Sequence, residues 1–135
     1  MKSRDTLIRL RRFQADEKRR KVAQIEAMIA DFARMAADLD REIGQEEQRA
    51  GISDPAHFAY PTYARAAAQR RDNIRRSAQD LDVQLAEAKA ALAEAFEELK
   101  KVEILDDRER SGERVAENAR DQANMDAIGL GRARA

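Results

Sequence analysis

The residues with which this chain could do acid–base or metal chemistry are few and lie far apart. It has one histidine, His57, and no cysteine, so thiol nucleophiles, disulfides and thiolate metal sites are excluded. The acidic pairs Glu46-Glu47 and Glu97-Glu98 are adjacent in sequence, so on a helix their carboxylates diverge by about 100° and do not form a paired-carboxylate site. Gly129 and Gly131 follow no expected strand, so they do not predict a phosphate-binding loop. We therefore expect no enzyme, no metal site and no cofactor.

The composition is typical of long helices. The 135 residues hold 26 Lys and Arg and 26 Asp and Glu, with 39% charged and 4% aromatic residues, 5 Gly and 2 Pro. Such a chain cannot bury a thick core, and its length allows one domain at most. The formal net charge of zero argues against a dedicated nucleic-acid binder. No apolar run approaches the ~20 residues of a membrane span, and the start has no signal-peptide stretch, so we expect a soluble, cytoplasmic protein.

Two stretches repeat apolar residues at alternating steps of three and four, the pattern of a coiled-coil seam. The first consists of Val22, Ile25, Ile29, Phe32, Ala36, Leu39 and Ile43. The second consists of Ile74, Ala78, Leu81, Leu85, Ala88, Leu92, Ala95, Leu99 and Val102. The turn residues Gly51, Pro55 and Pro61 lie between them.

These seams predict an all-α fold, a long antiparallel two-helix coiled-coil hairpin over residues 1–110. We expect one helix over about 4–50, a loop over 51–61 and a second helix over about 62–110. After that the seam positions become acidic, so residues 111–135 are expected to be a charged tail, frayed or disordered.

The charges favour this antiparallel arrangement. Residues 1–21 carry a net charge of +6 and residues 22–50 carry −4, whereas 62–80 carry +3 and 81–107 carry −5. An antiparallel hairpin places each block against one of opposite sign, whereas a parallel in-register dimer would place like on like. We therefore expect a monomer.

The same reasoning predicts the register of the hairpin. Facing seam residues have numbers with a constant sum, and a sum of about 117 alternates large and small side chains across the seam. A slip of one heptad, to a sum of about 110, would oppose like charges at two places. The preferred register predicts four ion pairs beside the seam: Arg12–Glu103, Lys21–Glu98, Glu26–Lys89 and Asp40–Arg75.

Two segments are candidate partner-binding sites. The first lies near the open end of the hairpin, where apolar side chains project beside arginines; its residues are Leu7, Arg9, Leu10, Arg11, Arg12 and Phe13. An interface and a frayed helix end both account for it. The second is the loop, where Phe58, Tyr60 and Tyr63 are three of the chain's six aromatics. They either close the end of the seam or form an exposed anchor for a partner.

Three stretches of the chain resemble a known family. They are RLRRFQADEKRRKVAQIEAMIADF (9–32), DPAHFAYPTYARAA (54–67) and AFEELKKVEILDDRE (95–109). They are similar to the flagellar export protein FliJ family in its shorter, alphaproteobacterial form. The loop sequence is the most specific of the three, because it does not follow the heptad pattern that many coiled coils share.

This resemblance implies a small antiparallel coiled coil that acts as a stalk in flagellar type III protein export. Its implied partners are the hexameric export ATPase, the export gate at the inner membrane and the export chaperones. No family motif assigns a site residue by residue. Two other classes of function stay open: a structural spacer or self-associating adaptor, and a helix that binds nucleic acid through the basic residues between Arg9 and Lys21.

Overall fold

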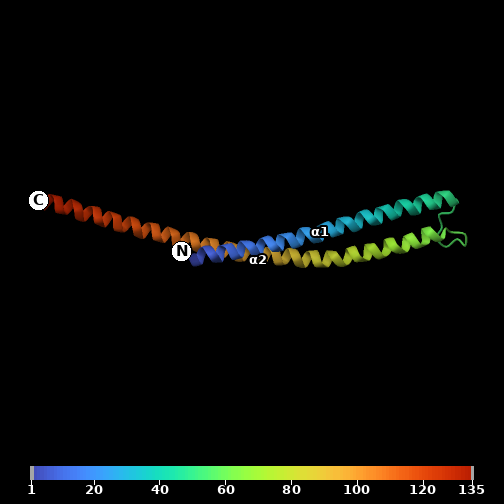
Figure 1. The fold of residues 1–135 in the computed structure, drawn as a ribbon, viewed down its shortest axis with the longest axis horizontal. Helices are drawn as coiled ribbons and strands as arrows, with labels where there is room; N and C mark the ends of the chain where they lie inside the picture. The colour runs from blue at the N-terminus through green and yellow to red at the C-terminus, as the bar shows by residue number, and fades with distance from the viewer. Residues whose placement is uncertain (1, 135) are drawn as a thin grey trace. The chain divides into compact units, whose positions relative to one another are not determined.

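The computed structural model describes the backbone of residues 2–134 and the side chains of residues 3–131. It consists of two helices, α1 (Lys2–Ala50) and α2 (Thr62–Arg134), joined by the segment 51–61 (Figure 1). No strand occurs among the described residues. The prediction of an all-α helical hairpin is confirmed. Within 2–134, neither helix has a stretch long and apolar enough to cross a membrane.

By its contacts the chain divides into two units. Unit 1 pairs the start of α1, up to Ala15, with the part of α2 from Glu94 onward. Unit 2 comprises Asp16–Ala93, which is the rest of both helices and the loop.

The first turn of the loop in unit 2 ends α1 through a well-defined cap. Gly51 has a positive φ of 69°, and its N–H donates to the carbonyl of Gln48 (3.3 Å). The next N–H, of Ile52, donates to the carbonyl of Glu47 (3.2 Å). This is the Schellman pattern, in which glycine takes the left-handed conformation that other residues rarely adopt.

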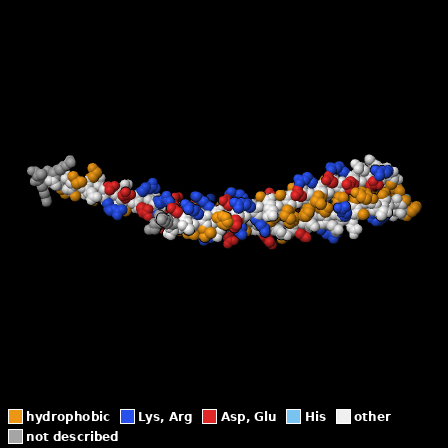
Figure 2. All heavy atoms as spheres, in the orientation of Figure 1, with side chains coloured by type: hydrophobic (Ala, Val, Ile, Leu, Met, Phe, Trp, Pro, Cys, Tyr) orange, Lys and Arg blue, Asp and Glu red, His pale blue; other side chains and the backbone are white. Residues whose placement is uncertain are grey.

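The best-packed part of unit 2 lies beside this loop. Its buried residues are Leu39, Ile43, Tyr60, Ala64 and Ala67, and the partly buried Ile52, Ala68 and Ile74 pack against them. The two alanines have no side chain beyond Cβ, so α1 can approach α2 closely there. Figure 2 shows apolar side chains gathered on the face of unit 2 towards the loop, with charged side chains beside them.

In unit 1, the core is thin and includes a charged residue. Ile8 and Ala15 of α1 are buried, and Asp106 of α2 is only 8% exposed. From residue 107 to residue 131 every side chain is exposed. We predicted a helix that ends at about residue 110, but α2 continues to Arg134. No proline interrupts it, and Arg110 bonds back to Asp106 one turn earlier (3.0 Å).

The predicted register is wrong by one heptad. In unit 2, the hydroxyl of Tyr63 bonds to Glu42 and Arg71 pairs with Asp40, so the paired numbers add to 105 and 111. In unit 1, the buried carboxylate that Arg4 meets is that of Asp106, and these numbers add to 110, whereas its contact with Glu113, which adds to 117, is to an exposed side chain. A sum of about 117 would place Tyr63 some twelve residues, or about 18 Å, from Glu42 along the axis.

Two of the four flanking ion pairs nevertheless form. Arg12 lies 3.8 Å from Glu103 and Arg75 lies 2.8 Å from Asp40. Side chains on a helix lean towards its N-terminus, so each long arginine reaches a carboxylate several residues past the position directly opposite. These pairs are therefore compatible with either register and did not discriminate between the two.

Candidate functional site

The N-terminal segment, defined as residues 7–13, presents an apolar strip on the outside of α1. Because Ile8 and Ala15 point inward to α2, residues at steps of three from Leu7 turn to the outer side of the helix. Leu7, Leu10 and Phe13 are accordingly 39%, 48% and 54% exposed. The strip is the most concentrated set of exposed large apolar side chains on α1.

The arginines of the N-terminal segment fall into two groups. Arg9 and Arg12 are exposed, and Arg12 is paired with Glu103 at 3.8 Å. Arg11 is half-buried, and its Nη1 donates to Gln14 within α1 (3.1 Å). The segment thus offers an apolar strip with two accessible cations beside it, while Arg11 faces the helix pair.

An ion-pair network holds the beginning of α1 against α2. The largely buried Arg4 reaches three acidic residues, Asp106 (3.4 Å), Glu109 (2.6 Å) and Glu113 (3.2 Å). Arg110 closes the network by pairing with Asp5 (3.3 Å) and Asp106 (3.0 Å). The hydrogen bond and charge of Asp106 raise the pKa of Arg110. These contacts position the N-terminal segment, since they lie one turn before it.

The loop aromatics do not act as one cluster. Phe58 is 95% exposed, and its ring stacks on His57 with the ring centres 4.7 Å apart. Tyr60 is only 6% exposed and belongs to the core, with the Arg65 guanidinium 5.6 Å from its ring centre. Tyr63 is half exposed. The expected exposed anchor is therefore reduced to Phe58 and, in part, Tyr63, while Tyr60 closes the end of the seam.

The single histidine has a structural role in this loop. The Nδ1 atom of His57 accepts a hydrogen bond from the backbone N–H of Ala59 (3.0 Å), and its carbonyl accepts one from Tyr60 (3.0 Å). The backbone N–H of His57 donates to the carbonyl of Asp54 (3.0 Å). The side-chain carboxylate of Asp54 accepts a hydrogen bond from the backbone N–H of Ala56 (3.0 Å). Within residues 3–131, no three His, Cys, Asp or Glu side chains are placed to hold a metal ion.

The two tyrosines should ionise only at unusually alkaline pH. Burial raises the pKa of Tyr60, and the hydrogen bond to Glu42 (2.7 Å) raises that of Tyr63. Because the folded state prefers both phenols protonated, their contribution to stability is present below the ordinary pKa of 10.0 and is lost as the pH rises through the higher folded-state values.

We expect the tyrosinate absorbance to rise with a midpoint above 10.0, and to return to about that value in urea. The chain has only two tyrosines, so the variants Y60F and Y63F assign each step. Midpoints of the folded and the unfolded chain that coincide would contradict the burial of Tyr60 and the Tyr63–Glu42 bond.

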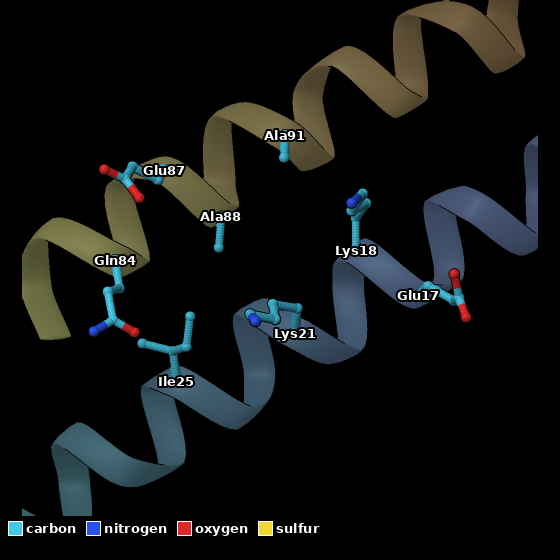
Figure 3. A pocket seen from close by; sticks show the side chains of 8 residues that line it. All are labelled: Glu17, Lys18, Lys21, Ile25, Gln84, Glu87, Ala88 and Ala91. Atoms are coloured by element: carbon cyan, nitrogen blue, oxygen red, sulfur yellow. The ribbon is translucent and has the colours of Figure 1, made fainter.

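A groove in unit 2 is a surface that the sequence did not single out. It has a volume of about 610 Å³ and is lined by Glu17, Lys18, Lys21 and Ile25 of α1 and by Gln84, Glu87, Ala88 and Ala91 of α2 (Figure 3). The sequence does contain one indication of this groove, because Lys18 occupies a seam position where the heptad pattern predicts an apolar residue. Because this polar residue faces small alanines, the seam is not filled at this position and a groove is left between the helices.

A protein-family model matches nearly the whole chain. The family model described as "Flagellar FliJ protein" matches residues 1–134. No curated protein and no solved structure matches the chain significantly. Because the family match extends over nearly the whole chain, the protein belongs to the flagellar FliJ family.

Proposed function

We propose that this protein is a non-catalytic stalk and chaperone-escort component of flagellar type III protein export. In this proposal it works in the cytoplasm and associates peripherally with the export apparatus at the inner membrane. It binds the hexameric export ATPase through the N-terminal segment, and it does no chemistry of its own. Membership of the FliJ family supports the role in flagellar export.

The observation that carries the proposal is the outward strip of Leu7, Leu10 and Phe13. Side chains of this size that are left about half exposed are used at interfaces, where burying them against a partner is favourable. Arg9 and Arg12 flank the strip and can pair with carboxylates at the rim of such an interface. The Arg4 network keeps the helix ordered, so little conformational entropy is lost on binding.

The loop is proposed to contact the export gate. Phe58 projects almost fully from a turn held by the hydrogen bonds of Asp54 and His57. A single exposed aromatic on a rigid turn is suited to insert into an apolar pocket of a partner. Tyr63 lies close by in sequence and adds a polar contact.

Co-purification with the flagellar export ATPase of the same cell tests the proposal. We expect the full chain to be retained by the ATPase and to raise its ATP turnover several-fold, because a bound stalk would favour the assembled ring. Absence of both retention and stimulation would contradict the role at the ATPase. Retention by the isolated gate domain, lost in F58D, would support the role of the loop.

A further inference from the structure

We infer that the groove of unit 2 is a binding site for an acidic amphipathic helix of a partner protein. The site goes beyond the proposed function, because none of its lining residues belongs to the N-terminal segment or to the loop. It rests on three observations: the shape of the groove, its apolar floor and the two lysines beside it.

The groove has the dimensions of a helix-docking site. The α1 residues that line it extend from Glu17 to Ile25, which is about 12 Å along the helix, or a little over two turns. Ile25 is buried, and Ala88 and Ala91 are half-buried and have no side chain beyond Cβ. Alanine on a helix lets another helix approach closely, so this floor can accept the Leu and Ala side chains of a third helix.

The lysines make the site selective for acidic groups. Lys18 and Lys21 lie on the α1 side of the groove, whereas the carboxylates of Glu17 and Glu87 point away from the space between the helices (Figure 3). Neither lysine has a carboxylate within ion-pair distance among the described residues, although Arg19 between them pairs with Asp16 (3.4 Å). A partner carboxylate would therefore meet cations that form no ion pair with the described residues.

The observed register explains why no described carboxylate pairs with these two lysines. With facing numbers that add to about 110, Lys18 and Lys21 lie opposite residues 89–92, whose one charged member is Lys89. The acidic part of α2, which would neutralise them in the predicted register, is not opposite. The spacing of three residues places both lysines on one side of α1, where carboxylates three or four residues apart on another helix can reach them.

A protein helix fits this site better than a polyanion. A phosphate backbone or an anionic lipid surface would also approach Glu17 and Glu87 at the edges and be repelled by them. A helix with carboxylates only along one line avoids those edges and covers the apolar floor. We therefore assign the occupant as a helix with Glu or Asp at steps of three or four and Leu or Ala between them.

Fluorescence anisotropy with the full chain tests the assignment. The probe is a labelled, stapled helical peptide of about 14 residues that carries this Glu and Leu/Ala pattern. We expect saturable binding that weakens about tenfold in K18E/K21E and in K18A/K21A, since two ion pairs are lost, and that weakens as salt rises from about 50 to about 500 mM. A91L, which fills the groove without changing charge, should weaken binding similarly.

The matched control is K100E/K101E, which reverses two exposed lysines of α2 outside the groove and should bind as the wild type does. Circular dichroism establishes that each variant keeps its helices. No binding of the acidic peptide at about 1 mM, or equal binding of the same peptide with Lys in place of Glu, would overturn the assignment. So would phosphatidylglycerol vesicles or duplex DNA that bind more tightly than the peptide and with the same dependence on Lys18 and Lys21. These outcomes are independent of the ATPase test, because no ATPase is present.

Discussion

Replacing Leu7, Leu10 and Phe13 together by aspartate is expected to abolish binding to the export ATPase. Each of these side chains is half exposed, and burying the remainder at an interface contributes about 1–2 kcal/mol. The three together then account for roughly 3–6 kcal/mol, or a loss of affinity of about two to four orders of magnitude. Surface plasmon resonance with the immobilised ATPase measures this loss, and the stimulation of ATP turnover should vanish with it.

The control for this variant must introduce the same charge elsewhere. Val115, Met125 and Ile128 of α2 are 68%, 69% and 59% exposed, and their replacement by aspartate adds three negative charges outside the N-terminal segment. We expect this control to bind the ATPase with nearly wild-type affinity. Full binding by L7D/L10D/F13D with unchanged helicity, or equal losses in both variants, would refute the role of the N-terminal segment.

Replacing Asp106 by alanine is expected to release the beginning of α1 from α2. Asp106 is 8% exposed and contacts two arginines, Arg4 (3.4 Å) and Arg110 (3.0 Å). Removing one partner of a buried pair leaves the other charge poorly compensated, although Arg4 keeps Glu109 and Glu113. We expect a loss of about 2–3 kcal/mol, seen as a roughly 30- to 150-fold faster hydrogen exchange of the amides of residues 3–15.

A second variant distinguishes the contribution of the ion pair from the contribution of side-chain packing. In R4L/D106L, two apolar side chains replace the charged ones at facing positions, and such exchanges are often neutral or stabilising. We expect the protection of residues 3–15 to return to at least the wild-type level, while the amides of Leu39 and Ile43 in unit 2 are unchanged in both variants. Normal protection in D106A would show that the network does not hold α1.

The secondary structure was readable from the sequence because it depends on local pattern. The seam residues, Gly51 and the two prolines predicted where α1 ends and where α2 begins, and the structure places these ends at Ala50 and Thr62. The position at which α2 ends could not be predicted from the sequence. Past Asp106 no apolar face distinguishes a helix from a coil, yet α2 continues to Arg134.

The candidate sites were readable only in part. The outward strip of the N-terminal segment follows from the seam, since residues one or two places from Ile8 must point elsewhere. The loop aromatics could not be sorted in this way, because exposure in a loop depends on its turns. A hydrogen-bonded turn at Asp54 and His57 projects Phe58, whereas Tyr60 folds back against Ala64 and Ile43.

The sequence by itself determined that this protein is a helical hairpin, because its heptads and opposed charge blocks leave few other ways to bury the apolar seam. Only the tertiary structure decided the register. Exposed ion pairs are worth about 0.3–0.5 kcal/mol each, too little to outweigh the close packing of Tyr60, Ala64 and Ala67 and the burial of Asp106 with Arg4. That one-heptad difference leaves Lys18 and Lys21 without an ion pair to the described carboxylates, beside the groove for which we propose a partner helix.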